Sequence, residues 1–381
     1  MTDQLQDAGG LARRAVLAGF GAGLCALVGL RAAEARGGPG ALFVSCRREG
    51  EDRYQASGIG LDGALRFDLP LPGRGHSTAF RPDRPECVVF ARRPGTFAVV
   101  IDHGADVALR RIDAPENRHF YGHGAFSPDG GTLFASENDF EGKRGIVGVY
   151  DARDGYRRIG EFESHGLGPH DLRLMPDQKT LMVANGGILT HPDFDRLKLN
   201  LPDMKPTLAF VDLASGRLLD EAKLPPSLHK LSTRHLAFGA DGVAAVAMQD
   251  EDDGPDLRPL VGVHRGGGIA LLDLPEPDLR RMVRYTGSTA FDAGGRVLAV
   301  SAPRGNMVAF WEIGADAGAD RWLGRLDLAD ACGVAPDGAP GGFLVTSGTG
   351  RVVRFDARAR TTQDVLPPGP GAWDNHTMRL A

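Results

Sequence analysis

Five of the eleven histidines occupy equivalent places in a repeated sequence pattern. Each lies three or four residues before the apolar residue that closes a short apolar strand. They are His76, His123, His170, His235 and His376. Neutral imidazole nitrogen is a preferred ligand of ferrous iron, copper and zinc, so a convergent set of histidines predicts a transition-metal site. The alternative is structural: each histidine caps its strand and hydrogen-bonds a neighbouring segment.

A difference in spacing divides the five histidines into two groups. His76, His170 and His376 lie four residues before the closing apolar residue, whereas His123 and His235 lie three residues before it. Because side chains alternate between the two faces of a strand, this offset would aim His123 and His235 away from the other three. We therefore expect the first group to act together and the second group to contribute less.

An internal repeat supplies the elements that position these histidines. Each unit has an apolar strand, a turn of the Pro-Asp-Gly kind, a second strand, and a third strand ending near Asp. The turn segments are AFRPD (79–83), AFSPDG (125–130), LRLMPD (172–177), LAFGADG (236–242), TAFDAGG (289–295) and CGVAPDG (332–338). Proline fixes φ in such a turn, and Asp-Gly supplies a side-chain hydrogen bond and a left-handed residue. Short strands at this spacing predict six four-stranded propeller blades.

The seventh blade is split between the two ends of the chain. ALFVSCRR (41–48) and YQASGIGLD (54–62) fit a second and a third strand, and residues 376–380 fit the missing inner strand. The predicted fold is therefore an all-β, seven-bladed β-propeller closed by pairing of the N- and C-terminal strands in one blade, which leaves no open edge. Counting the split blade first, the histidines occupy blades one to five, and Gly287 and Asp330 take the equivalent positions in blades six and seven.

Several polar residues are expected on the same face as the histidines. The loops that follow the second strands return to this face and carry Arg92, Glu137, Asn185 and Gln249, while Asp374 lies two residues before His376. We expect these five to orient the imidazoles or to meet the ligand, although each also has an ordinary interpretation as solvated loop chemistry.

Two insertions and four further histidines complete this picture. Insertions at 186–206 and 251–267 lengthen the connection between second and third strands, so both should cover the same face. We expect the remaining histidines of the outer turns to lie at the surface; these are His103, His119, His165 and His229.

The N-terminus has the pattern of an export signal. Arg13 and Arg14 precede an uncharged apolar run (15–30) that ends in Ala33-Glu34-Ala35. This pattern predicts a twin-arginine signal peptide at residues 1–35 and a periplasmic mature domain at residues 36–381. A single membrane anchor is the alternative, but the run is shorter than the roughly 20 residues that cross a bilayer. The twin-arginine route carries folded proteins, so a ligand could be loaded before export.

Composition and cysteine content narrow the function classes. The formal net charge is −5 and no basic segment suggests a nucleic-acid partner. We expect a monomer with no integral membrane segment in the mature protein. After removal of the signal, Cys46, Cys87 and Cys332 remain, which allows at most one disulfide. No Gly-x-Ser-x-Gly elbow and no dinucleotide-binding glycine loop occurs.

The repeats resemble those of YVTN and lactonase-like seven-bladed propellers over nearly the whole mature chain. A sharper resemblance rests on the leader, on GHGAFSPDG (122–130) and GPHDL (168–172), and on WDNHTMRL (373–380). These segments resemble an uncharacterised family of twin-arginine-exported bacterial propellers, often encoded beside imelysin-type and other periplasmic iron-uptake proteins. The resemblance implies a role near iron acquisition, with iron-uptake proteins as partners, and it names no reaction.

The leading hypothesis is a periplasmic binding protein that handles a metal ion or metal complex at a histidine-lined channel mouth. Imidazole-rich sites favour ferrous iron, copper or zinc over ferric iron, which prefers oxygen donors. Two alternatives stay open. One is a metal-dependent or lactonase-like enzyme, with a histidine as general base and Glu137 holding a divalent ion. The other is a protein-interaction scaffold without a small ligand.

Overall fold

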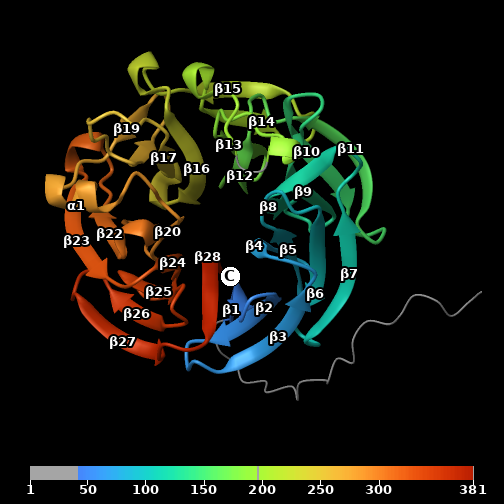
Figure 1. The fold of residues 1–381 in the computed structure, drawn as a ribbon, viewed down its shortest axis with the longest axis horizontal. Helices are drawn as coiled ribbons and strands as arrows, with labels where there is room; N and C mark the ends of the chain where they lie inside the picture. The colour runs from blue at the N-terminus through green and yellow to red at the C-terminus, as the bar shows by residue number, and fades with distance from the viewer. Residues whose placement is uncertain (1–41, 195–196, 381) are drawn as a thin grey trace, which may run out of the picture. The chain divides into compact units, whose positions relative to one another are not determined.

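A computed structural model describes residues 42–194 and 197–380 of the chain. Within these residues, twenty-eight strands form seven antiparallel sheets of four strands each, arranged around a central axis (Figure 1). The predicted seven-bladed propeller is therefore confirmed. The predicted signal peptide at residues 1–35 lies outside the described residues and stays a prediction.

The blades follow one another around the ring in chain order, from the innermost strand of each blade to its outermost strand. Blade 1 consists of β28 (Gly371–Arg379), β1 (Leu42–Glu49), β2 (Arg53–Gly60) and β3 (Leu65–Leu71). Blade 2 consists of β4 (Gly75–Phe80), β5 (Glu86–Ala91), β6 (Phe97–Asp102) and β7 (Val107–Asp113). Blade 3 consists of β8 (Arg118–Phe126), β9 (Thr132–Asp139), β10 (Arg144–Asp151) and β11 (Arg157–Glu163). Blade 4 consists of β12 (Pro169–Leu174), β13 (Thr180–Asn185), β14 (Thr207–Asp212) and β15 (Leu218–Ala222).

The remaining three blades have the same layout. Blade 5 consists of β16 (Leu231–Phe238), β17 (Ala244–Asp250), β18 (Val261–His264) and β19 (Ile269–Leu271). Blade 6 consists of β20 (Ser288–Phe291), β21 (Val297–Ala302), β22 (Met307–Glu312) and β23 (Arg321–Asp327). Blade 7 consists of β24 (Ala331–Pro336), β25 (Gly342–Ser347), β26 (Val352–Asp356) and β27 (Thr361–Leu366).

Among the residues that the structure describes, helical structure is confined to short connections. The α-helix α1 (Glu276–Arg281) links blades 5 and 6. The 3-10 turns are η1 (Pro192–Phe194), η2 (Leu201–Asp203), η3 (Pro226–Leu228), η4 (Ala240–Gly242), η5 (Pro303–Gly305) and η6 (Ala317–Ala319). No helix within residues 42–194 and 197–380 is long and apolar enough to cross a membrane.

The ring closes through the pairing that the sequence predicts. Strand β28 pairs antiparallel with β1, and the register places Phe43 opposite Arg379 and Val44 opposite Met378. Strand β28 also lies between β24 and β4, the inner strands of the two neighbouring blades (Figure 1). The last strand therefore joins the first blade to the seventh, and it pairs with the inner edge of β1.

The repeated turns hold the strands of each blade in register. In the AFSPDG turn, the Ser127 hydroxyl donates to Asp129 at 2.6 Å, and the amide of Gly130 donates to the carbonyl of Ser127 at 2.9 Å. Gly130 has a φ of +68°, a left-handed conformation that favours glycine. The turn reverses the chain tightly enough for β8 and β9 to pair directly.

Apolar side chains between neighbouring blades form the core. Phe90 of blade 2 packs against Phe120 of blade 3 with ring centroids 5.8 Å apart, and Phe120 meets Tyr150 at 6.5 Å. All three are buried. Each such side chain contributes roughly 1.5–3 kcal/mol through its burial, so this packing makes the inner strands a rigid scaffold.

Candidate functional site

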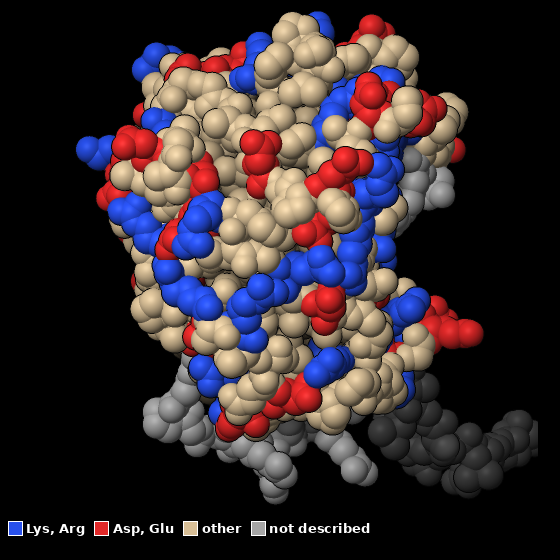
Figure 2. All heavy atoms as spheres, turned by 90° about the vertical axis from the view of Figure 1, so that its left-hand side faces the viewer, with Lys and Arg blue, Asp and Glu red and all other residues tan. Residues whose placement is uncertain are grey.

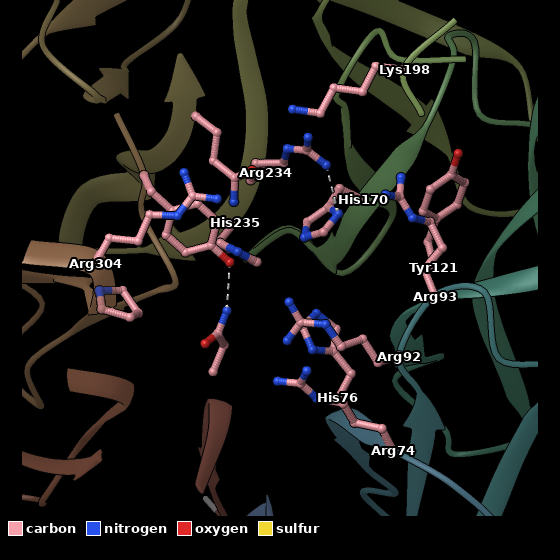
Figure 3. Close-up of a pocket in the computed structure, with 14 residues that line it drawn as sticks. Arg74, His76, Arg92, Arg93, Tyr121, His170, Lys198, Arg234, His235 and Arg304 are labelled. Atoms are coloured by element: carbon pink, nitrogen blue, oxygen red, sulfur yellow. Dashed lines mark hydrogen bonds between the residues drawn. The ribbon is translucent and has the colours of Figure 1, made fainter. Parts of the chain in front are cut away.

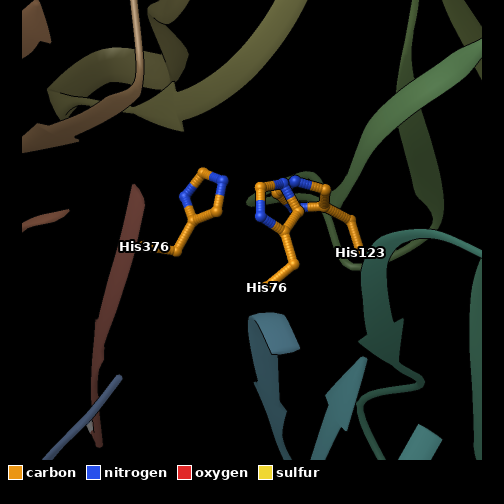
Figure 4. Close-up of side chains that lie close together, drawn as sticks. All are labelled: His76, His123 and His376. Carbon is orange, nitrogen blue, oxygen red and sulfur yellow. The ribbon is translucent and has the colours of Figure 1, made fainter. Parts of the chain in front are cut away.

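The five histidines of the sequence pattern converge in the central channel. They come from five inner strands, β4, β8, β12, β16 and β28. Ring centroids lie 4.4 Å apart for His76 and His376, 4.7 Å for His123 and His376, and 4.6 Å for His235 and His376. The rings of His170 and His235 lie 4.7 Å apart. The five imidazoles therefore form one continuous group, which we call the histidine cluster (Figure 4 shows three of its members).

The expectation that His123 and His235 point away from the other three is wrong. The pairing register shifts between Phe120 and Gly124 in β8, and between Thr233 and His235 in β16. These irregularities resemble β-bulges, which insert a residue and so reset the alternation of side chains between the two faces. Comparable shifts occur in β4 and β12. Strand β28 also shifts register against β1, so every inner strand that carries a histidine of the cluster is irregular near that histidine. Regular alternation does not apply there, and all five rings meet in the cluster.

Two of the histidines are backed by buried carboxylates. Nδ1 of His76 lies 3.4 Å from Oδ1 of Asp374, and Nδ1 of His123 lies 3.1 Å from Oδ1 of Asp171. A carboxylate at Nδ1 holds the proton on that nitrogen and leaves the Nε2 lone pair for a ligand. Nε2 of His123 and Nε2 of His376 are buried and have no hydrogen-bond partner among the described residues. Side-chain nitrogens of His76, His123 and His376 lie within 4.8 Å of one another, the spacing of a possible metal site.

A second group of three consists of His123, His170 and His235. Nδ1 of His170 lies 3.3 Å from the guanidinium of Arg234, which can only donate, so His170 accepts there with its lone pair. Nδ1 of His235 is buried without a partner in the described chain. Because Arg234 occupies the lone pair of His170, the first group is the better arranged for binding a cation.

Burial keeps four imidazoles of the cluster uncharged. Burial lowers the pKa of His76 to about 3, against the opposing effect of the Asp374 carboxylate. Burial, followed by the neighbouring imidazoles, also lowers the pKa values of His170, His235 and His376 well below the usual range. These four imidazoles are therefore in the neutral, ligating form at neutral pH.

The Asp374 carboxylate behind His76 is ionised. Burial by itself would raise its pKa, but His76, Arg92 and Arg74 outweigh that effect, so the pKa lies well below its usual range. Arg74 Nε and Arg92 Nη1 donate to its two oxygens at 2.5 and 2.9 Å. This buried anion is therefore fixed by cations on one side and by an imidazole on the other.

Two cavities reach the cluster from opposite ends of the inner strands. The first has a volume of about 400 Å³ and is lined by His76, His170 and His235 together with six cationic side chains, Tyr121, Gln249 and Tyr285 (Figure 3). We call it the cationic cavity. The second, of about 250 Å³, is lined by His235, His376 and the far ends of inner strands, including Phe238 and Arg379. The cluster therefore separates two hollows of the channel.

Three of the five supporting residues expected from the sequence lie at this site. Asp374 contacts His76, while Arg92 and Gln249 line the cationic cavity. The structure does not bring Glu137 and Asn185 to the cluster. Glu137 accepts from Tyr150 at 2.7 Å and from Arg158 at 3.0 Å inside blade 3. Asn185 donates to the Ser164 carbonyl and to Thr207.

The first insertion lines the cationic cavity, and the second lies behind its wall, on the same face as expected. Lys198 of the first insertion lines it, and Glu251 of the second pairs with both Lys198 and Arg234. Sequence reasoning missed Asp171 and Arg234. Each is adjacent in the chain to a histidine of the cluster, and that adjacency was the available signal.

His119 is not a surface residue, contrary to expectation. It lies in β8, which begins at Arg118, and only 1% of its surface is exposed. Its ring packs on Tyr121 at 5.2 Å and on Phe140 at 6.2 Å. The cysteines Cys46, Cys87 and Cys332 are buried and free, so none of the three forms a disulfide.

The fold and the site define a seven-bladed β-propeller with a histidine cluster in its channel. Residues 69–380 match the family described as protein of unknown function DUF1513. The chain therefore belongs to the DUF1513 family. The curated proteins contain no match to this sequence.

Two solved structures have a similar fold. The Pseudomonas aeruginosa periplasmic gluconolactonase PpgL is similar with a TM-score of 0.62 and 17% identity, over 90% of this chain and 99% of that one. The hydrazine synthase of Kuenenia stuttgartiensis is similar with a TM-score of 0.59 and 15% identity, over 81% of this chain and 88% of that one. At these identities the likeness concerns the fold alone, which is the propeller fold that the repeats predict.

Proposed function

We propose that this protein is a periplasmic binding propeller that handles a transition-metal ion or metal complex at the histidine cluster. His76, His123 and His376 are the proposed ligands. The observation that carries the proposal is the convergence of buried imidazole nitrogens, two of which, on His123 and His376, have no hydrogen-bond partner in the described chain.

The energetics favour a ligand at these nitrogens. A buried polar atom without a partner costs roughly 1–3 kcal/mol, and a bound metal ion would remove that cost at several atoms together. The donors in the first group are all imidazoles, which suits ferrous iron, copper or zinc better than ferric iron. Metal–imidazole bonds of about 2.0–2.1 Å place two ligands of one ion at most about 4.2 Å apart. The nitrogens of the first group lie within 4.8 Å of one another, so no more than small rotations of the rings would bring them around one ion.

The cellular setting of the proposal rests on the sequence. The twin-arginine leader supports a periplasmic location, and the family resemblance supports a role in iron acquisition with iron-uptake proteins as partners. Ferrous iron is the ion that satisfies both the imidazole donor set and this setting.

Calorimetric titration of the metal-free protein with ferrous, cupric and zinc ions at about pH 7.5 tests the proposal. Changing His123 or His376 to Ala should weaken binding about tenfold or more, as expected for loss of a ligand. His229→Ala is the matched control, because His229 lies in a turn and bonds only the Pro226 carbonyl in the described structure. Thermal unfolding of each variant checks the fold.

Two results would overturn the assignment. If none of the three ions binds the wild-type protein, the scaffold alternative gains support. If His123→Ala and His376→Ala both bind metal as tightly as His229→Ala, the ligands lie elsewhere.

A further inference from the structure

We propose that the cationic cavity is the binding site of a small oxyanion carrying two or more negative charges, a polycarboxylate or a phosphate compound. A metal at the histidine cluster would then be held as part of an anionic complex. Only this second statement rests on the proposed function, because the anion site is made of residues other than the proposed metal ligands, except that His76 also lines the cavity.

The charge of the cavity wall is strongly one-sided. Six cationic side chains line it: Arg74, Arg92, Arg93, Lys198, Arg234 and Arg304. No Asp or Glu is among the described residues that line it. Two carboxylates lie behind the wall: Asp374 pairs with Arg74 and Arg92, and Glu251 pairs with Lys198 and Arg234. Six positive charges less two negative charges leave a net charge of +4 around the cavity.

Two of these cations have no carboxylate partner in the described chain. Arg93 forms no salt bridge and no side-chain hydrogen bond there. Burial, Arg234 and Arg92 lower its pKa, against the opposing effects of Tyr121 and Glu251. Arg304 lies over the ring of Tyr285, with its guanidinium carbon 4.3 Å from the ring centroid. Charges of one sign held in a partly buried cavity repel one another, and a bound anion would relieve this repulsion.

Two hydrogen-bond donors in the same wall also lack partners. The Tyr121 hydroxyl and Nε of Arg234 are buried and make no hydrogen bond to another described residue. Both residues line the cavity, close to Arg93 and His170 (Figure 3). Hydrogen bonds to ionised oxyanions are among the strongest in proteins. One guanidinium group can donate two parallel hydrogen bonds to the two oxygens of a carboxylate or phosphate. The unused donors therefore fit an oxyanion better than a neutral ligand.

The charge pattern outside the cavity is different. The side of the propeller seen in Figure 2 has acidic and basic side chains interspersed, and the whole chain carries a net charge of −5. The concentration of positive charge in the cavity is therefore local. A cleft of one sign within low-dielectric walls focuses the field and attracts ligands of the opposite charge. A volume of about 400 Å³ suits a small ligand.

Calorimetric titration of metal-free protein in a buffer without phosphate or carboxylate tests the anion site. The probes are citrate and pyrophosphate, and triethyl citrate is the uncharged control. We expect at least one of the two anions to bind, no binding of the ester, and weaker binding as sodium chloride rises from about 50 to about 500 mM. Binding of citrate alone identifies a polycarboxylate site, and binding of pyrophosphate alone identifies a phosphate site.

Arg93→Met is the decisive variant, because Arg93 has no partner to lose in the described structure. It should bind the anion about tenfold more weakly or worse. Arg110→Met is the matched control: Arg110 is exposed on β7 and likewise forms no salt bridge in the described chain. If Arg93→Met does not fold, Arg304→Gln tests the same wall, because Arg304 lines the cavity and its side chain is exposed.

Failure of the anion site and failure of the metal site can be told apart. The proposal is overturned if neither anion binds, if triethyl citrate binds as well as citrate, or if Arg93→Met and Arg304→Gln both bind like Arg110→Met. Zinc titration of Arg93→Met without added anion reports on the histidine cluster, and the affinity should be equal to or higher than the wild-type value, because the variant removes one positive charge from the cavity wall.

Discussion

The buried His119 makes a quantitative prediction about acid stability. Its Nδ1 lies 3.0 Å from the Phe120 carbonyl, and the Asn138 amide nitrogen lies 3.0 Å from its Nε2. The carbonyl can only accept and the amide nitrogen can only donate, so the proton lies on Nδ1 and Nε2 accepts. The same Asn138 nitrogen also lies 3.3 Å from the Thr190 carbonyl, which supports this orientation of the amide. Protonation of Nε2 would place two donors against each other.

The magnitude follows from the pKa. Burial lowers the pKa of His119 from 6.5 to about 4, the Phe120 carbonyl opposes this, and Arg93 adds to it. Because the unfolded chain binds the proton more tightly, the contribution to stability is complete above pH 6.5 and is lost as the pH falls from 6.5 towards 4. At pH 5 the loss from this one residue is about 2 kcal/mol.

Urea unfolding of metal-free protein at pH 8 and pH 5 measures the contribution of His119 to stability. Between pH 8 and pH 5 the free energy of unfolding falls in both proteins, and we expect the fall to be about 2 kcal/mol smaller in His119→Gln than in the wild type. His229→Gln is the control and should follow the wild type. If His119→Gln loses as much stability as the wild type, His119 is not held neutral by its surroundings and the reasoning is refuted.

Three further predictions concern closure, the site and export. Removing residues 376–381 should markedly lower the melting temperature, because β28 loses its pairing with Phe43, Val44 and Ser45 of β1; a cooperative transition within a degree or two of the parent would contradict this closure. Asp374→Asn should weaken zinc binding about tenfold, because His76 loses the carboxylate behind its Nδ1. The same variant should strengthen citrate binding, because the net charge around the cavity rises from +4 to +5. If zinc and citrate affinities change in the same direction, the two sites are not separate. Replacing Arg13 and Arg14 by Lys should leave precursor in the cytoplasm, and undiminished mature protein in a periplasmic fraction would exclude the twin-arginine route.

The fold was predictable because its signals are local. A Pro-Asp-Gly type of turn recurs between two short apolar strands, and each copy specifies the same hairpin without help from the rest of the chain. The closure was predictable because six complete units leave only one arrangement for the two strand-like ends. Residues 42–49 and 371–379 pair as that argument requires.

The site was predictable in composition but only partly in geometry. Equal placement in the repeat identified five histidines, yet it could not reveal the register shifts that turn His123 and His235 to the axis. Glu137 is a residue that the repeat placed at the site but that the structure does not. It precedes a loop on the correct face, but its carboxylate is engaged inside the blade by Tyr150 and Arg158, which lie on other strands of the blade. A local sequence pattern does not predict contacts that depend on bulges or on residues from other strands.

The arrangement of the channel joins the two proposed sites through charge. Arg234 donates to His170 and repels a proton there, so the cationic wall helps to keep the imidazoles neutral and able to bind a metal ion. The same wall, at +4, repels a divalent cation that arrives alone. An oxyanion in the cavity would offset that repulsion, and its oxygen atoms would be available as further ligands next to His76, the proposed metal ligand that also lines the cavity. Because coupling between two binding equilibria is reciprocal, an anion that tightens metal binding must itself be tightened by the metal to the same degree.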